Sequence, residues 1–379
     1  MPKLFVGNFD FEHELAGESK PTKPVDAVLR DLAACWVGLA EPDDLVLADR
    51  NHELPFIDER RIDKLTNRSD FVLAPWGWTQ SIHDWGHQHG LKVDHAEFDV
   101  IQRASSRAYS FQLEQEFDTI LPLSRSINDA SQVHDALTEI LTNHRQWVIK
   151  ANWGMSARER LVGRKANLED NQLRWLNKRL RHDRPAFLEP WVESLEELSF
   201  QWQIDRAGNV NYLGSTKLLS DPLGGYVGSR ILDKHSEDWD SAFSTIEQTV
   251  HQLAHEGYFG PLGIDAMKYL DNSGHQRFRP LQDINARFTM GRMAVAMKRF
   301  LEPGETGTWF HIRGNKRSNR TAAELVRMLP EKLCSVRVLS PMQFDTKAHR
   351  IPVLIAANSM SDIERVESNV LELMFEPGN

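Results

Sequence analysis

Residues 264–292 have the pattern of a β-hairpin with polar side chains along one face. Apolar residues dominate 264–270, a turn follows at 271–274, and residues 277–292 are RFRPLQDINARFTMGR. Alternate residues of a strand point to opposite faces of a sheet. Asp283, Asn285 and Arg287 are therefore expected to share one face. The other face would carry Gln282 and three residues that can pack on a core, Ile284, Ala286 and Phe288.

The same hairpin would place Asp265, on its first strand, near Asp283 and Asn285. Carboxylate and amide oxygens are suitable ligands for a hard divalent cation. The guanidinium of Arg287 beside them can bind a phosphate. Taken alone, this stretch is explained at least as well by a half-solvated strand with a polar outer face. Whether this stretch is a cation and phosphate site or only a half-solvated strand depends on what the rest of the chain contains.

Length and composition favour a globular protein of several packed units. The chain has 379 residues, of which 41% are hydrophobic and 26% charged, so it is not a disordered chain. A net charge of −9 and a pI of about 5.9 argue against nucleic acid or an anionic membrane as a partner. Two cysteines far apart in sequence, Cys35 and Cys334, argue against a disulfide framework and against a cysteine zinc site.

The N-terminal residues lack the apolar core of a signal peptide, and no apolar run approaches the roughly 20 residues that cross a bilayer. A soluble, cytoplasmic protein is therefore expected. The first hundred residues predict a parallel α/β unit, with strands at 3–6, 44–48 and 71–74 and a helix at 24–39. No G-x-G-x-x-G follows the first strand, so a dinucleotide site has no support.

Residues 75–90 contain three tryptophans and three histidines. His83 and His87 are four residues apart and could share a helix face, with His89 nearby. A metal site is conceivable, but no carboxylate follows in a ligand pattern, and surface or interface histidines are the more common case. We therefore do not predict a metal site in this segment.

A basic loop follows a short strand in the middle of the chain. Helices are predicted at 104–117 and 132–141, and a strand at 146–150 ends in Lys150. The loop 151–160 contains Gly154 and several arginines, and Arg164 follows. A lysine at a strand end beside such a loop can bind polyphosphate through its charge and through backbone N–H groups. An exposed turn with basic side chains explains this loop equally well.

The second half of the chain predicts an antiparallel sheet and a terminal α/β segment. Strands are expected at 186–192, 199–204, 210–213, 215–219 and 228–232. Apolar residues at helical spacing over 239–253 predict an amphipathic helix that stops at Gly257. After a linker at 303–307, we predict a helix at 318–329, strands at 336–339 and 352–356, and a helix at 361–374.

This order of elements resembles the ATP-grasp superfamily over roughly residues 1–300. That family typically shows Gly–aromatic–x–Gly–x–x–Gly–x–Asp after a helix, and later Glu–x–Asn–x–Arg. The chain has GYFGPLGID at 257–265 and DINAR at 283–287. The resemblance implies an α/β and α+β protein with the ATP-grasp fold. It would have a Rossmann-like pre-ATP-grasp domain (1–100), a small subdomain with the phosphate loop (101–185), a large subdomain with the metal site (186–300) and a C-terminal α/β appendage (301–379).

The resemblance also implies roles for individual residues. Lys150 is similar to the phosphate-binding lysine, and residues 152–160 with Ser156 resemble the flap over the γ-phosphate. Arg107 would be a second basic phosphate contact. Glu197 would hold the ribose. The remaining nucleotide-binding and catalytic candidates are the adenine linker residues Glu189, Trp191 and Val192, the metal ligands Asp265, Asp283 and Asn285, and the phosphate or substrate contacts Lys217, Arg230 and Arg287.

The implied activity is ATP-dependent joining of a small-molecule carboxylate to an amine or thiol through an acyl phosphate, with Mg²⁺, or alternatively Mn²⁺, as the cation. Two departures from the family pattern keep other functions open. Asp283 stands where the family usually has glutamate, and the flap has one glycine, Gly154, where many members have several. The alternatives are phosphoryl transfer to a hydroxyl and nucleotide binding without turnover. The sequence does not name the substrates or an oligomeric state.

Overall fold

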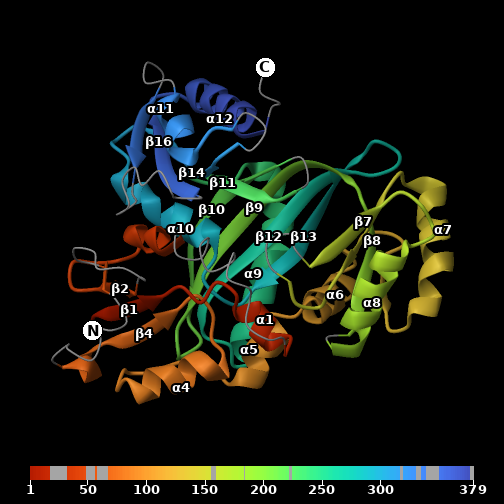
Figure 1. The fold of residues 1–379 in the computed structure, drawn as a ribbon, viewed down its shortest axis with the longest axis horizontal. Coiled ribbons are helices and arrows are strands. Elements are labelled where there is room, and N and C mark those ends of the chain that lie inside the picture. Colours follow the sequence, from red (N-terminus) through yellow and green to blue (C-terminus); the bar gives the residue numbers. More distant parts are fainter. Residues whose placement is uncertain are drawn as a thin grey trace.

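The computed structural model describes residues 1–17, 32–47, 56–57, 67–154, 159–182, 184–221, 224–315, 319–329, 334–338 and 350–375. Three β-sheets form among these residues, and the chain passes from the N-terminal sheet to the small sheet and then to the large one (Figure 1). No helix in these ranges has both the length and the apolar character needed to cross a bilayer.

The N-terminal sheet is parallel, as predicted, with the strand order β3–β2–β1–β4. Its strands are β1 (Lys3–Val6), β2 (Leu45–Leu47), β3 (Phe56–Ile57) and β4 (Val72–Pro75), and its short helices are α1 (Phe11–Leu15) and α4 (Gln80–Gln88). The described part of the helix predicted at 24–39 is helical, but it is the 3₁₀ helix η1 (Leu32–Gly38) rather than an α-helix. Residues 24–31 lie outside the described residues.

The helix predicted at 104–117 is confirmed as the second of two consecutive helices, and it begins three residues later than predicted. The two helices are α5 (Phe98–Ala104) and α6 (Arg107–Glu116). Ser106 begins α6, because its side chain accepts a hydrogen bond from the backbone N–H of Tyr109. A serine at this position satisfies a donor that the first helical turn leaves free. The break matters for the site, since it sets Arg107 at the first position of α6.

The small sheet is antiparallel, with the strand order β5–β8–β6–β7. It consists of β5 (Arg125–Ile127), β6 (Trp147–Lys150), β7 (Arg160–Gly163) and β8 (Ala186–Pro190), with the helices α7 (Val133–Asn143) and α8 (Asp170–His182). Its core contains Ile127, Leu137, Trp147, Leu176 and Leu188. The strand predicted at 146–150 is confirmed, and it ends at Lys150.

The large sheet has eight antiparallel strands in the order β13–β12–β9–β10–β11–β14–β16–β15. They are β9 (Glu193–Ile204), β10 (Val210–Ser220), β11 (Tyr226–Ile231), β12 (Gly260–Leu270), β13 (Gln276–Asn285), β14 (Thr306–Arg313), β15 (Ser335–Val338) and β16 (Arg350–Ala357). The strands predicted at 210–213 and 215–219 are one strand, β10, with a register shift between Tyr212 and Gly214. Three strands of the C-terminal segment thus join the large sheet rather than forming a sheet of their own.

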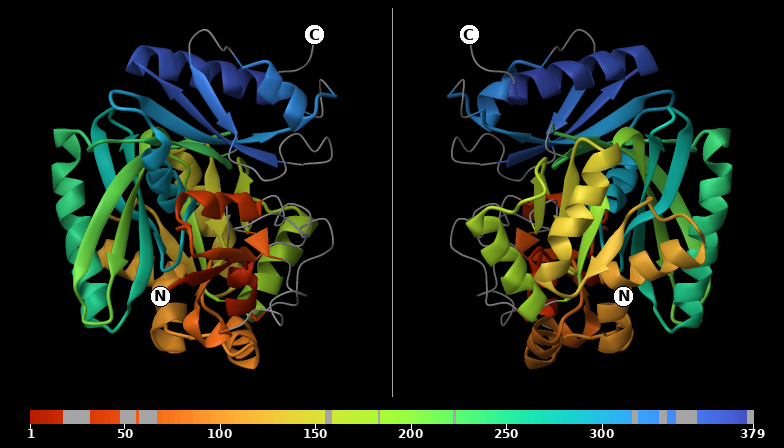
Figure 2. Two further views of the ribbon diagram at one scale, coloured as in Figure 1. Left: turned by 90° about the vertical axis from the view of Figure 1, so that its left-hand side faces the viewer. Right: turned by 90° about the vertical axis from the view of Figure 1, so that its right-hand side faces the viewer.

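Helices cover both faces of the large sheet. The helix α9 (Asp240–His255) packs on one face against alternate β9 residues such as Phe200 and Trp202. The helices α11 (Ala322–Arg327) and α12 (Met360–Phe375) pack on the C-terminal strands. The helix α10 (Met290–Met297) lies on the other face with the N-terminal sheet (Figure 2). The odd-numbered β9 residues face this second side, where the candidate site lies.

Candidate active site

A cavity of about 480 Å³ opens where the three sheets meet. Its walls include Lys150 at the end of β6, Glu197 on β9, Asp283 on β13 and Tyr226 on β11. Trp76, which follows β4, closes it from the N-terminal side. The cavity therefore collects side chains from segments far apart in the sequence, as a site between two lobes requires.

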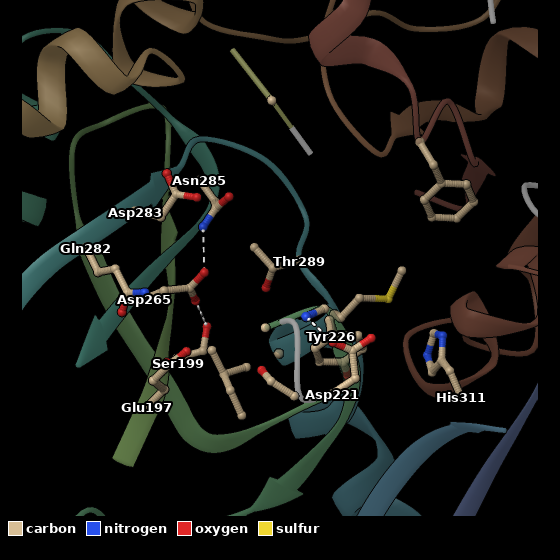
Figure 3. A pocket seen from close by; sticks show the side chains of 18 of the residues that line it. Glu197, Ser199, Asp221, Tyr226, Asp265, Gln282, Asp283, Asn285, Thr289 and His311 are labelled. Carbon is tan, nitrogen blue, oxygen red and sulfur yellow. Dashed lines mark hydrogen bonds between the residues drawn. The ribbon is translucent and has the colours of Figure 1, made fainter. Parts of the chain in front are cut away.

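The predicted hairpin brings the acidic residues together at this cavity. Asp265 on β12 is directly opposite Asp283 on β13, and Gly263 is opposite Asn285. The side-chain amide of Asn285 donates to Asp265 over 3.2 Å, Nδ2 to Oδ2 (Figure 3). Because Nδ2 faces Asp265, the Oδ1 atom of Asn285 is the atom that can bind a cation. The expected convergence of the three side chains is confirmed.

A chain of hydrogen bonds holds Asp265 in place. Ser199 donates to Asp265 over 2.5 Å, Gln201 donates to the Ser199 hydroxyl over 2.7 Å, and Thr289 donates to Gln201 over 2.6 Å. Gly263 makes room for this chain, since a Cβ there would lie 2.6 Å from Thr289 Cγ2. Burial, with a smaller contribution from Asp283, raises the pKa of Asp265 to about 7, against the Ser199 hydrogen bond.

The acidic group fits a magnesium ion that is shared with a nucleotide. Among the described residues, no three histidine, cysteine or carboxylate side chains are placed so that they could hold a metal ion by themselves. Mg²⁺, however, is usually held by only one or two protein carboxylates together with substrate phosphates and water. Asp265, Asp283 and the amide oxygen of Asn285 provide that donor set. A cation would replace the proton that the raised pKa allows on Asp265.

The predicted face of the second strand is only partly correct. Leu281 is in the core while Gln282 lines the cavity, so Gln282 does not share the inner face with Ile284 as expected. A register shift between Asp265 and Met267 changes the alternation opposite this segment. Strand β13 also ends at Asn285, so Arg287 lies in the turn that follows rather than on the strand.

Arg287 nevertheless lines the cavity, and it connects two parts of the fold. Its guanidinium pairs with Glu12 of α1 over 2.9 Å and donates to the carbonyl of Phe288. Glu12 is buried, which raises its pKa, while Arg287 opposes that rise. The pair fixes the guanidinium at the edge of the cavity, beside Trp76.

The lysine at the end of β6 belongs to a buried ionic network. Lys150 Nζ lies 2.6 Å from Glu189, and Arg279 of β13 bridges Glu189 and Glu114 with contacts of 2.9 and 2.7 Å. Burial would raise the pKa of Glu189, but Arg279 and Lys150 outweigh burial and hold that pKa well below its usual range. The network joins the small sheet to the large one and sets Lys150 at the cavity wall.

Arg107 connects the basic and acidic walls. Its Nη1 atom lies 3.4 Å from Asp283, and its Nε donates to the carbonyl of Ala151 at the start of the predicted flap. Asn152 accepts a hydrogen bond from the N–H of Ala108, so the flap is attached to the first turn of α6. Ser156 lies outside the described residues. Gly154 lines the cavity.

The predicted nucleotide linker lies beside these groups. The side chain of Glu189 belongs to the Lys150 network. The backbone N–H of Trp191 donates to the carbonyl of Gln146, and the guanidinium of Arg160 lies over the Trp191 ring. Val192 packs in a small cluster with Leu121 and Met267. Glu197, the predicted ribose contact, lines the cavity together with Lys150 and Arg107. The backbone of the linker remains a prediction for adenine binding.

Comparison with known proteins identifies the architecture. A scan of protein-family models and a search of curated proteins found no match. Among solved structures, carboxyaminoimidazole ribonucleotide synthase from Aspergillus clavatus with ATP superposes with a TM-score of 0.57 at 11% identity, covering 99% of each chain. Biotin carboxylase from Campylobacter jejuni gives 0.56 at 11% identity, covering 99% of this chain and 95% of its own. An N5-carboxyaminoimidazole ribonucleotide synthetase with ADP gives 0.57 at 13% identity, covering 90% and 94%.

The chain has the ATP-grasp fold. The two lobes that give this fold its name correspond to the small sheet, which carries Lys150, and the large sheet, which carries Asp265 and Asp283. At such low identity the likeness establishes the fold alone, so individual residues have to be judged by their own geometry.

The ATP-grasp geometry does not bring Lys217 and Arg230 to the cavity. Both lie outside its described lining, on the sheet face that α9 and α12 cover. Lys217 pairs with Glu196, and Arg230 is held by Glu367 of α12 over 2.9 Å. Side-chain alternation explains the placement of Lys217, because its strand neighbour Leu218 is the residue that faces the cavity. Arg230 thus has a structural partner, and its predicted catalytic role has no geometric support.

Several residues at the site were not predicted. Ser199 follows Glu197 at a spacing of two, so strand alternation could have suggested it, whereas the irregular pairing between Arg279 and Asp283 removes that argument for Arg279. Asp221, His311, Arg313 and Arg350 line the other end of the cavity. Their sequence carries no signal, because they come together only through strand pairing in the large sheet.

The histidines of residues 75–90 form a small cluster without a carboxylate ligand set. His83 Nδ1 and His95 Nε2 lie 2.7 Å apart, and the rings of His83 and His87 meet edge to face. His89 contacts the carbonyl of Trp85. Trp76 is the residue of this segment that reaches the cavity.

A buried histidine at the cavity gives a testable pH dependence. Burial, together with the charge of Arg350, lowers the pKa of His311 from its ordinary value of 6.5 to about 3. Folding therefore excludes a proton that the unfolded chain binds below pH 6.5, and stability falls as the pH falls from there toward 3. At about 1.4 kcal/mol per pKa unit, we expect a loss of about 1.5 kcal/mol between pH 6.5 and about pH 5. Urea unfolding of wild type and His311→Gln at both pH values measures it. Equal pH dependence in the two proteins would contradict the assignment.

Proposed function

We propose that this protein is an ATP- and Mg²⁺-dependent ligase that joins a small-molecule carboxylate to an amine or thiol. The observation that carries the proposal is the pairing of opposite charges across one cavity. Lys150 and Arg107 approach it from the small sheet and α6, and Asp265, Asp283 and Asn285 approach it from the large sheet. A triphosphate with its cation needs both kinds of wall at once.

The reaction would proceed in two balanced steps. A carboxylate oxygen attacks the γ-phosphorus of ATP, the bond to the β-phosphate oxygen breaks, and ADP leaves. The nitrogen or sulfur nucleophile then attacks the acyl carbon of the acyl phosphate, loses a proton and expels phosphate. Transfer of a phosphoryl group depends mainly on alignment and charge neutralisation, and a covalent enzyme intermediate is not needed.

The residues at the cavity match these needs. Lys150 neutralises phosphate charge, and Arg107 and Arg287 supply guanidinium groups that can hold phosphoryl or acyl oxygens. A bound magnesium ion, with Asp265, Asp283 and Asn285 as its protein ligands, supplies further charge neutralisation. Glu197 lies on the same wall and is our candidate for the ribose contact. Glu12 keeps Arg287 directed along the cavity edge.

Related ATP-grasp structures suggest which substrates to test first. One complex of the Aspergillus clavatus synthase contains ADP and 5-aminoimidazole ribonucleotide. A biotin carboxylase domain from Hydrogenobacter thermophilus contains MgADP and bicarbonate. Bicarbonate is therefore a reasonable first acid to test with this protein, and 5-aminoimidazole ribonucleotide a reasonable first amine.

A trapping experiment separates the ligase from its alternatives. Purified protein is incubated with ATP, Mg²⁺, hydroxylamine and a panel of carboxylic acids, and hydroxamate and ADP are measured. We expect hydroxamate in proportion to ADP for one acid, because hydroxylamine intercepts the acyl phosphate.

Other outcomes would assign a different function. ADP with a stable phosphoester and no hydroxamate would identify a phosphotransferase. Protection of the protein by ATP against thermal unfolding, with no ADP from any acid, bicarbonate or hydroxyl compound, would identify a nucleotide-binding protein without turnover. Either result would refute the proposed ligase activity.

A further inference from the structure

Three histidines meet beside α4, outside the described lining of the cavity. His83 and His87 lie one turn apart on α4, and His95 belongs to the segment that leads to α5 (Figure 1). The ring centroid of His83 lies 4.5 Å from that of His87 and 4.9 Å from that of His95. Because none of the three is among the described residues that line the cavity, the proposed reaction does not use them.

Hydrogen bonds determine which ring nitrogen carries the proton in two of these histidines. Nδ1 of His95 lies 2.7 Å from the carbonyl oxygen of Ala96, and a carbonyl can only accept, so this nitrogen carries a proton. In the neutral ring Nε2 of His95 is then an acceptor, and it lies 2.7 Å from Nδ1 of His83. His83 therefore donates from Nδ1, which leaves a lone pair on its Nε2 atom. His95 uses both of its nitrogens and is not itself a metal ligand.

His87 extends the same face of the helix. Residues four apart on a helix are neighbours on its surface, and the rings of His83 and His87 meet edge to face. His87 is exposed, and within the described part of the chain neither its ring nor Nε2 of His83 has a hydrogen-bond partner. Two imidazoles at this spacing can bind one divalent ion together.

The surroundings keep His83 in the form that binds a metal. Its ring packs edgewise on Phe98, and Trp78 packs on His95, so both rings are held in place. Burial, with a smaller contribution from His95, lowers the pKa of His83 below its ordinary value of 6.5, while Asp84 opposes that shift. His83 is thus neutral near pH 7. A metal-binding histidine usually donates its other ring N–H to a fixed acceptor, as His83 does to His95.

We propose that His83 and His87 bind a divalent transition-metal ion such as Zn²⁺, with Nε2 of His83 as one ligand, and that His95 is the positioning residue that orients His83. Water would complete the coordination of an ion held by these two side chains. Imidazole nitrogens favour zinc, nickel and copper, whereas oxygen ligands favour magnesium. The site is therefore distinct in chemistry from the acidic group at the cavity, and it does not depend on the proposed function.

The test titrates Zn²⁺ into the full-length protein by calorimetry, with excess Mg²⁺ present to compete at carboxylates. The variants are His83→Gln, His87→Gln and His95→Phe, each with a circular dichroism spectrum to check the fold. The matched control is His251→Gln/His255→Gln. It removes a second pair of exposed histidines four residues apart, at the end of α9.

We expect wild type and the control to bind Zn²⁺ with the same affinity. The affinity should fall at least about tenfold in His83→Gln and His87→Gln, and about 10–100-fold in His95→Phe, the usual cost of removing a partner that orients a metal ligand. An unchanged affinity in His87→Gln, or an equal loss in the control, would overturn the proposed site. An unchanged affinity in His95→Phe would overturn the positioning role.

Nitrogen NMR of the histidine rings in the wild-type protein gives a second test that needs no variant. Without metal, the proton of His83 should be on Nδ1, and Zn²⁺ should shift the Nε2 resonance of His83 while His95 keeps its proton on Nδ1. A His83 proton on Nε2, or no change at His83 when Zn²⁺ is added, would contradict the inference.

Discussion

Replacing Arg279 with methionine is expected to lower the free energy of unfolding by about 3–5 kcal/mol. Arg279 is buried and bridges two buried carboxylates, Glu114 and Glu189. Its removal would leave Glu114 without its cation and Glu189 with Lys150 alone. A buried charge without a partner costs far more than the intact pair contributes, so the loss should be large.

Urea unfolding monitored by tryptophan fluorescence measures this effect. Arg277→Met is the matched control, because Arg277 lies two residues earlier on β13 and pairs with Asp271 at the exposed hairpin. An exposed ion pair contributes at most about 1 kcal/mol, so the control should be close to wild type. Similar losses in the two variants would show that the buried network has no special role in stability.

Replacing Lys150 with methionine is expected to lower the rate of ADP formation about 10²–10³-fold, the usual effect of removing one charge-stabilising group. Lys150 is the cation that the end of β6 places at the cavity wall. The fold should survive, because Glu189 keeps Arg279 as a partner. A coupled assay of ADP release with the acid found by trapping, together with a circular dichroism spectrum, measures both properties.

The control for this variant is Lys298→Met, which removes an exposed lysine that pairs with Asp233 over 2.6 Å. It should retain wild-type turnover. If the Lys150→Met protein turned over at the wild-type rate, the nucleotide would not bind at this end of the cavity. That result would also contradict the proposed roles of Arg107 and the flap.

The acidic side of the site could be predicted because its determinants are local. A short turn at 271–274 and the alternation of DIN at 283–285 were enough to bring Asp265, Asp283 and Asn285 together. The predicted strand positions of Gln282 and Arg287 were wrong, because simple alternation takes no account of register shifts or of where a strand ends. A register shift moves Gln282 to the cavity, and the strand ends before Arg287.

Features that depend on distant strand pairing could not be predicted. Lys217 and Arg230 belong to the correct sheet, but the face to which each points depends on register. The C-terminal segment joins the large sheet through pairing of β14 with β11, strands separated by more than seventy residues in the chain. The cavity end at Arg313 and Arg350 exists only because of that pairing.

The central claim is that Lys150 and the acidic residues of the β12–β13 hairpin hold the two sides of one nucleotide tail. A crystal structure with a non-hydrolysable ATP analogue and Mn²⁺ tests it most directly, since anomalous scattering locates the cation. We expect the manganese peak among Asp265, Asp283 and Asn285, with the γ-phosphate analogue in contact with Lys150. A nucleotide bound elsewhere, or a cation peak away from these three residues, would contradict this account.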